Sequence, residues 1–399
     1  MHDSAAILLS LFLIFVAAQV GGELAQRLKL PAVVGEIAAG CVIGPSALGW
    51  VALPDIATGT PLDVLAEIGV ILLLFSVGLE TRLDDLKKVG TSAVLVGVLG
   101  VLVPFALGAV WAHGSGFDWI RSMFVAAAFV ATSAGITARV LQELGVLQRR
   151  EARIILGAAV IDDILAMLLL GVVSSLQGGG DVDVGGLLGT LLGAVGFVAV
   201  IGWGGTRVMR RGSGWLDKPS HPMSPLAIVL ALCLGLAYLS MRFHLAAIIG
   251  AFLAGMIASE TRQRHQLEEQ TAPLLAFLTP FFFVVTGAKV NLAALGSGSA
   301  LLTLAVVTVI AIVSKLAGGY LGAIVGAGKL GQRSALIVGF GMVPRGEVGV
   351  VIASLGLAAG VFDETIYAVI VAMSLLTAMV TPPILSLLLR SPSSTPGTP

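Results

Sequence analysis

The sequence predicts an all-α polytopic membrane protein with thirteen transmembrane helices, arranged as two six-helix halves of inverted topology joined by one linking helix. Three observations support this. First, 57% of the 399 residues are hydrophobic and only 12% are charged, whereas a soluble domain carries roughly 25% charge. Second, Lys and Arg collect in alternate loops. Third, an eleven-residue pattern occurs twice. The net charge of zero argues against nucleic acid as a partner.

The spans are read from apolar runs between polar or Gly/Pro breaks. A helix needs about 20 apolar residues to cross the hydrocarbon core. The candidate spans are 5–27, 32–50, 63–83, 90–113, 119–142, 151–176, 184–209, 223–241, 244–261, 271–290, 298–326, 332–358 and 363–388. The tail 391–399 is rich in Ser, Thr, Pro and Gly, so we expect it to be disordered.

The distribution of Lys and Arg predicts the orientation. With the N-terminus outside, 17 of the 23 Lys and Arg residues fall in inner loops and three in outer loops. Short cytoplasmic loops carry the excess of positive charge. We therefore expect an extracellular N-terminus and a cytoplasmic C-terminus. The remaining three cations, Arg139, Lys315 and Arg345, lie within or at the ends of spans.

An internal repeat accounts for the two halves. Residues 30–40 and 245–255 are identical at five of eleven positions, and they open the second and ninth spans. A shift of seven spans is odd, so the second copy must be inverted in the membrane. Inverted halves with ion sites near the bilayer midplane are typical of secondary transporters.

The repeat pairs the fifth span with the twelfth, and both contain helix-disrupting residues. The fifth has residues 131–135, including Ser133 and Gly135, and the twelfth has 339–344, including Gly341 and Pro344. Corresponding interruptions in the two halves indicate a binding site, because unwound carbonyls can coordinate a cation. The alternative is that membrane helices tolerate Gly and Pro for packing.

The strongest functional signal is a pair of adjacent acids, Asp162 and Asp163, inside a run that is apolar from 154 to 173. An ionised acid near the middle of a span costs about 2.5–3.5 kcal/mol on insertion scales, so such residues mark ion or proton paths. On a helix the two side chains point about 100° apart. One can face a cavity at the broken helices while the other meets a cation, and the spacing alone leaves open which does which.

Lys315 is the natural partner of this acid pair, because buried cations in lipid seek acids. At 4 Å and an effective dielectric constant of 20, the attraction is about 4 kcal/mol, which offsets much of the burial cost. Two acids and one lysine leave excess negative charge, so the pocket can hold either protons or a bare cation. The alternative is a structural ion pair that holds the helices together.

Three further charged groups are interpreted more weakly. Glu347 follows Arg345 by two residues and can pair with it locally, as a structural or a functional contact. Glu36 begins a Gly/Ala-rich span, where a packing or capping role is favoured. Glu80, with the neighbouring Arg82, is interpreted as a solvated pair at the membrane boundary.

Several motifs together resemble a known family. They are residues 31–36 with 44–46, 74–80, 132–141, 161–163 with Lys315, and 344–349. The likeness runs from about residue 5 to 388. On these residues the chain is identified as a member of the monovalent cation:proton antiporter-2 family of bacterial sodium/proton antiporters. It is especially similar to the NapA-type members and more distantly to NhaA, one of the handful of well-known inverted-repeat transporters.

The resemblance implies an NhaA-like fold with crossed, broken helices, and it implies roles at the site. Asp163 matches the main acid that binds Na⁺ or a proton, and Asp162 matches the acid that pairs with the lysine at Lys315. Thr132 matches a breakpoint residue that can give an oxygen to the ion. Members with two acids and this lysine exchange more protons than sodium ions per cycle. No cofactor is expected beyond the transported Na⁺, Li⁺ and H⁺.

The resemblance also implies how the single transporter unit, 5–388, is organised. It implies a homodimer in the bacterial inner membrane, with anionic lipid at the dimer interface. Relatives specialised for potassium often carry a C-terminal nucleotide-binding domain, which we do not expect here. The expected parts are a dimerisation domain (5–83 and 223–290), a core ion-transport domain (90–176 and 298–388) that moves like an elevator, and a linker helix (184–209).

Rival functions remain open at this stage. The nearest is K⁺/H⁺ exchange on the same scaffold, which sequence does not separate from Na⁺/H⁺ exchange. A symporter for an organic anion and an ion channel are further alternatives. An intramembrane aspartyl protease needs two acids that face each other from different helices, whereas Asp162 and Asp163 are neighbours on one helix. We therefore expect a transporter rather than an enzyme.

Overall fold

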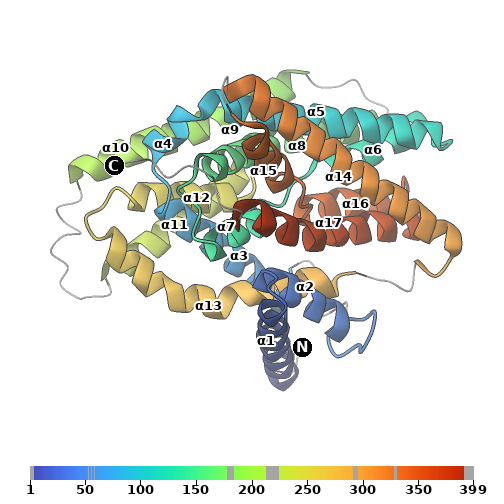
Figure 1. Cartoon of the computed structure of the whole chain (residues 1–399), viewed down its shortest axis with the longest axis horizontal. Coiled ribbons are helices and arrows are strands. Elements are labelled where there is room, and N and C mark those ends of the chain that lie inside the picture. Colours follow the sequence, from blue (N-terminus) through green and yellow to red (C-terminus); the bar gives the residue numbers. More distant parts are fainter. Residues whose placement is uncertain are drawn as a thin grey trace.

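The computed structural model describes residues 4–52, 54, 56–57, 59–177, 184–212, 224–290, 295–327 and 330–390. Every regular element within these ranges is helical, and Figure 1 shows the helices packed side by side. The elements are α1 Ser4–Arg27, α2 Ala32–Ile43, α3 Pro61–Leu79, α4 Leu83–Lys88, α5 Gly90–Gly114, α6 Trp119–Val130, α7 Ala134–Glu143, α8 Arg150–Gln177, α9 Val184–Ala199, the π-helical η2 Val200–Gly205, α10 Thr206–Gly212, α11 Ser224–Arg242, α12 Ala247–Ala258, α13 Arg264–Ala288, α14 Gly298–Ala327, α15 Gln332–Gly341, α16 Glu347–Ala358 and α17 Glu364–Arg390.

Ten helical stretches among the described residues are long and apolar enough to cross a membrane, and three shorter apolar helices accompany them. The chain is therefore an all-helical polytopic membrane protein, as predicted. Each of the thirteen expected ranges contains helix, but four of them contain only helices of 12 residues or fewer, namely 32–50, 119–142, 244–261 and 332–358. The count of thirteen spans therefore stays a prediction. The expected disordered tail, 391–399, lies outside the described residues.

Some boundaries differ from those read in the sequence. The second range, 32–50, is helical only to Ile43, because the chain turns at the Gly44-Pro45 step and proline removes a backbone donor. α13 begins at Arg264, seven residues before the expected start, since its first two turns are polar and escape a hydropathy reading. The six-residue helix α4 was read as a loop.

The two copies of the repeat make matching close contacts. A Cβ on Gly35 would lie 1.9 Å from a backbone oxygen of α1, and one on Gly250, at the equivalent position, 2.0 Å from a backbone oxygen of α11. Likewise, a Cβ on Gly40 or Gly255 would lie 2.1 Å from a backbone oxygen of α13 or α3 respectively. These helix pairs correspond under the seven-span shift. The contacts support the repeat, while the inverted orientation of the halves stays a prediction.

The packing of α5 against α14 places the predicted lysine. A Cβ on Gly318 would lie 2.4 Å from the Leu99 carbonyl oxygen, and one on Gly322 2.6 Å from Val96 Cα. Small residues let membrane helices approach this closely. The consequence is that Lys315, one turn away on α14, reaches the backbone of α5 in the interior of the helix bundle.

Candidate ion-binding site

Two interrupted helices meet at the centre of the site. α6 ends at Val130 and α7 begins at Ala134, while α15 and α16 are separated by residues 342–346. The Ser133 amide donates to the Pro344 carbonyl (2.8 Å), so the two breaks are joined directly. The breaks predicted from Ser133, Gly135, Gly341 and Pro344 therefore lie against each other, at helix ends that leave backbone groups without intrahelical partners.

Threonine hydroxyls strengthen this junction. Thr137 Oγ1 donates to the Gly341 carbonyl at 2.7 Å, and Thr132 Oγ1 lies 3.4 Å from the Met342 carbonyl. Thr132 is 5% exposed and Ser133 is fully buried. Among the described residues, the Ser133 hydroxyl has no hydrogen-bond partner. It is thus an uncommitted oxygen at the breakpoint, where a cation could use it.

Lys315 pairs with Asp162. Its Nζ lies 2.6 Å from Asp162 Oδ1, and both side chains are fully buried. The same ammonium donates to the carbonyl oxygens of Gly100 (2.8 Å) and Val130 (2.6 Å). An ammonium has three donors, so all three are used. The second oxygen of Asp162, Oδ2, has no partner among the described residues.

Arg345 makes contacts that the sequence reading did not predict. Its side chain is fully buried, and its guanidinium donates to the carbonyls of Val130 (3.3 Å), Ala131 (3.2 Å) and Ala311 (3.0 Å). The guanidinium therefore caps the end of α6 and braces it against α14. The expected local partner, Glu347, begins α16, but its side chain lies outside the described part of the chain.

The position of Arg345 changes the charge of the site. The sequence reading counted two acids and one lysine, which leaves a negative excess. Asp162 and Asp163 are 0% and 5% exposed, and Lys315 and Arg345 are both 0% exposed. With all four groups ionised, the buried site is formally neutral. Entry of a cation with no loss of positive charge would give this site a net charge of +1.

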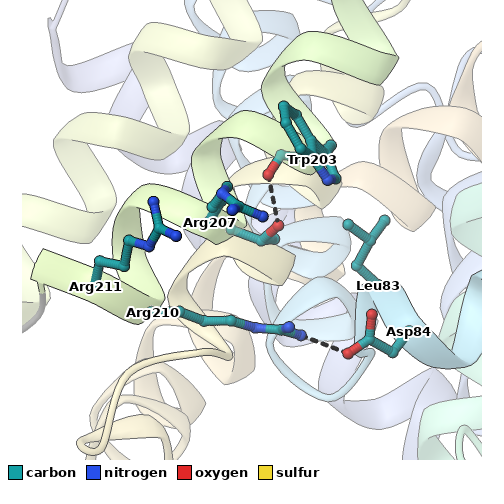
Figure 2. A pocket seen from close by; sticks show the side chains of 7 residues that line it. Leu83, Asp84, Trp203, Arg207, Arg210 and Arg211 are labelled. Atoms are coloured by element: carbon teal, nitrogen blue, oxygen red, sulfur yellow. Dashed lines mark hydrogen bonds and ion pairs between the residues drawn. The ribbon is translucent and has the colours of Figure 1, made fainter.

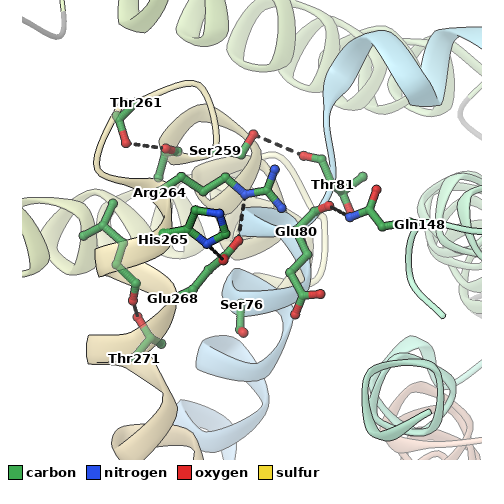
Figure 3. A network of polar contacts seen from close by, with 12 residues as sticks. Ser76, Glu80, Thr81, Gln148, Ser259, Thr261, Arg264, His265, Glu268 and Thr271 are labelled. Atoms are coloured by element: carbon green, nitrogen blue, oxygen red, sulfur yellow. Dashed lines mark hydrogen bonds and ion pairs between the residues drawn. The ribbon is translucent and has the colours of Figure 1, made fainter. Parts of the chain in front are cut away.

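A polar network joins α3 to α7 near one end of the bundle. Gln142 Nε2 donates to Ser76 Oγ (3.0 Å) and to Glu80 Oε1 (3.3 Å), and Gln148 donates to the Glu80 carbonyl. Figure 3 shows Glu80 beside Arg264 and Glu268 of α13. Burial raises the pKa of Glu80, which follows the last residue of α3. Glu80 is therefore partly buried and bonded to glutamines, not the solvated partner of Arg82 that was expected.

A second contact joins α2 to α7. Arg139 binds Glu143 on its own helix (Nε to Oε1, 2.8 Å) and lies 3.9 Å from the buried Glu36. Glu143 Oε2 accepts from the Ala32 amide at the start of α2. Glu36 is thus part of a charged contact between the ranges predicted as dimerisation and core domains. This contact could not be predicted from the sequence, because Glu36 and Arg139 are far apart in the chain and no local pattern links them.

A polytopic helical fold with interrupted helices around buried charges is typical of membrane transporters. The chain belongs to the sodium/hydrogen exchanger family, because the family model "Sodium/hydrogen exchanger, transmembrane" matches residues 10–391. The resemblance read in the sequence is therefore confirmed.

Similar proteins agree with this assignment. The chain is 36% identical over 418 residues to the high-affinity Na⁺/H⁺ antiporter NhaS3 of Synechocystis, covering 95% of this chain and 89% of the relative. It is 36% identical over 377 residues to the Na⁺/H⁺-K⁺ antiporter GerN of Bacillus cereus, covering 94% of both. Its fold is similar to that of the sodium proton antiporter MjNhaP1 of Methanocaldococcus jannaschii, with a TM-score of 0.69 at 18% identity over 96% of this chain and 99% of the other.

Proposed function

We propose that the protein exchanges Na⁺, or Li⁺, for H⁺ across the membrane. The observation that carries this proposal is the buried Lys315–Asp162 ion pair, 2.6 Å long, beside two helix breaks and the nearly buried Asp163. Family membership supports an exchange of cation for proton, and the names of NhaS3 and GerN include Na⁺ and H⁺.

Charge balance at the site suggests how exchange works. Asp163 carries either a proton or Na⁺, so the two ions compete for one carboxylate. Na⁺ would also draw on oxygens at the breaks, including the Thr132 hydroxyl, and on Asp162 once it leaves Lys315. With Asp163 ionised and Na⁺ bound, the four groups and the ion sum to +1, and release of a second proton, from Lys315, brings this sum to zero. More protons than sodium ions then cross per cycle, which makes exchange electrogenic.

Alternating access would come from movement between two parts of the chain. The core (90–176 and 298–388) would move like an elevator against the dimerisation domain (5–83 and 223–290), with 184–209 as the linker. We propose a homodimer in the bacterial inner membrane, with the N-terminus outside and a role in pH homeostasis. The contacts of Gln142 with α3 and of Arg139 with α2 cross this predicted boundary, and they would have to break during the movement.

K⁺/H⁺ exchange is the second candidate. GerN, which is 36% identical to this chain, is named as an antiporter of K⁺ as well as Na⁺. Backbone carbonyls and hydroxyls at the breaks are oxygen ligands that suit either ion. Rates measured with Na⁺, Li⁺ and K⁺ in turn separate the two functions, and the Na⁺/H⁺ proposal predicts higher activity with Na⁺ and Li⁺.

The experiment uses purified protein in vesicles with an imposed pH gradient. Addition of Na⁺ should collapse the gradient with the natural chain and have no effect with Asp163→Asn. Exposed Glu364→Gln, at the start of α17, is the matched control and should transport normally. Transport by Asp163→Asn at the natural rate would eliminate Asp163 as the carrier. Clamping the membrane potential with valinomycin should change the rate, and an unchanged rate would disprove electrogenic exchange.

A further inference from the structure

A hollow of about 270 Å³ lies between α4 and the end of the predicted linker helix, and no residue of the candidate ion site lines it. Its walls are Leu83, Asp84, Trp203, Thr206, Arg207, Arg210 and Arg211. Figure 2 shows the three arginines on α10, with the Arg210 guanidinium directed at Asp84. We call it the α4–α10 hollow. None of the charges that line it takes part in the exchange proposed above.

The arginines of the hollow differ in their partners. Arg210 is already bound, to Asp84 at 2.6 Å and to Glu260 at 2.8 Å. Arg207 and Arg211 form no ion pair within the described residues, and both side chains are exposed. They are four residues apart, so they share one side of the helix. Within the described part of the chain, the hollow therefore offers two guanidinium groups without a carboxylate partner, beside one that is neutralised.

The surface that leads to the hollow is apolar. Four large apolar side chains on this surface are half or more exposed: Leu188 (53%), Leu192 (70%), Val195 (50%) and Trp203 (57%). Their successive spacings of four, three and eight residues place them on one face of the α9–η2 helix. Trp203 lies at the end of this stripe, with the Arg207 guanidinium 5.4 Å above its ring. Tryptophan with arginine at the end of a transmembrane stretch marks the level of the lipid headgroups.

The stretch between the stripe and the arginines has an unusual backbone. Residues 200–205 form a π-helical segment, Val200–Gly205, and such segments are frequent at functional sites. The wider turn precedes α10 directly and sets the direction in which Arg207 and Arg211 point relative to Trp203. The apolar stripe, the interfacial Trp203 ring and the two arginines therefore follow one another along this helix.

We propose that the α4–α10 hollow binds the phosphate of an anionic phospholipid. Guanidinium groups suit phosphate because they donate paired hydrogen bonds, and basic pockets between transmembrane helices bind anionic headgroups. Arg207 and Arg211 hold the phosphate, and the acyl chains follow the stripe from Trp203 to Leu188. The apolar stripe favours a lipid over free phosphate, because only a lipid has acyl chains that can contact it. This site lies within one chain and is distinct from the lipid expected at a dimer interface.

Occupation of the hollow would have a mechanical consequence. α4 follows the predicted dimerisation range and precedes the predicted core range, while α10 ends the predicted linker. A lipid held between them ties the three parts together. The binding itself does not rest on the exchange reaction, since it can be measured without an ion gradient.

The test is thermal unfolding of the purified full chain in detergent with added phosphatidylglycerol, phosphatidylcholine or inorganic phosphate. Phosphatidylglycerol should raise the midpoint by about 5 °C, and the other two should not. In Arg207→Gln/Arg211→Gln the concentration of phosphatidylglycerol that gives half the shift should rise roughly tenfold or more. Arg150→Gln/Arg390→Gln removes two exposed arginines elsewhere and should behave as the natural chain.

Three results would overturn the proposal. An equal shift with phosphatidylcholine would show that charge is not recognised. An equal shift with inorganic phosphate would show a free-anion site. An unchanged response of Arg207→Gln/Arg211→Gln, whose own midpoint without lipid checks that it is folded, would place the lipid elsewhere. Native mass spectrometry of the same samples counts the bound lipids, and the double variant should lose one per chain.

Discussion

Lys315 and Arg345 donate to the same acceptor, the backbone oxygen of Val130, at 2.6 Å and 3.3 Å. Val130 is the last residue of α6, and the final carbonyls of a helix have no partner within it. Two buried cations from different elements therefore hold the end of one broken helix. Lys315 also binds Asp162. A displacement of Lys315 when this ion pair changes would therefore alter its hydrogen bond to the Val130 oxygen at the helix break.

The Lys315–Asp162 pair should show strong energetic coupling. Lys315→Gln leaves a buried carboxylate without its partner, and breaking a buried pair costs about 3–5 kcal/mol. Asp162→Asn leaves the ammonium with carbonyls alone. The double variant should lose less stability than the sum of the two single losses, as measured by thermal unfolding in detergent. Additive losses would show that the 2.6 Å contact contributes nothing to folding.

Arg345→Lys should not preserve the site. A lysine cannot span the carbonyls of Ala131 and Ala311, which the guanidinium reaches with two different nitrogens. Since a hydrogen bond to a charged group contributes about 1.5–3 kcal/mol, we expect a loss of about 3 kcal/mol. The half-saturating Na⁺ concentration should also rise, because the break shifts. Arg390→Lys, at the exposed end of α17, is the control, and equal behaviour of the two variants would refute the bracing role.

The sequence predicted the chemistry of the site better than its geometry. Asp162, Asp163 and Lys315 stand out because charge inside an apolar run is easily seen. The local pair of Arg345 with Glu347 stays a prediction, but no local pattern indicated the other contacts of Arg345. The chain is not helical at Arg345, and the guanidinium reaches carbonyls 30 or more positions away.

Some helix boundaries were predicted wrongly from the sequence for a related reason. Hydropathy locates apolar runs but does not see where polar turns extend a helix, as at the start of α13. Hydropathy also cannot distinguish a π-helical segment from an α-helix, because Val200–Gly205 has the same apolar composition as the α-helix before it. The contact of Glu36 with Arg139 depends on packing between distant segments, which no local pattern encodes.

Glu80 should make stability depend on pH. Burial raises its folded pKa above the ordinary value of 4.5, so the folded state holds this proton more tightly than the unfolded state does. The stabilisation is present in full below pH 4.5 and is lost as pH rises through the folded pKa. Glu80→Gln, which cannot ionise, should therefore match the natural chain at low pH and exceed its melting temperature at neutral pH.

The comparison needs a variant that removes a carboxylate elsewhere. Exposed Glu364→Gln serves this purpose, and its melting temperature should follow that of the natural chain across the same pH range. A constant difference between Glu80→Gln and the natural chain from pH 4 to 8 would contradict the role assigned to burial.

The contact between α3 and α7 should be broken during transport. Ser76 Oγ and Gln142 Nε2 are 3.0 Å apart and belong to the two parts predicted to move. In a chain with Cys41 and Cys233 replaced by Ala, we would introduce Ser76→Cys with Gln142→Cys. A short bis-methanethiosulfonate linker should stop exchange, and a reducing agent should restore it.

The matched control is Glu23→Cys with Arg27→Cys, an exposed pair one turn apart on α1. Linking these two residues should leave exchange unchanged. If the linked Ser76–Gln142 pair transports at the rate of the reduced protein, the two parts do not separate at this contact.

The central claim is that a cation and a proton compete for one buried carboxylate, Asp163. Its most direct test adds Na⁺ to purified protein in weakly buffered detergent solution and measures the protons released. The natural chain should release protons as Na⁺ binds, and Asp163→Asn should release none. Na⁺ binding without proton release, or equal release from Asp163→Asn, would contradict the account.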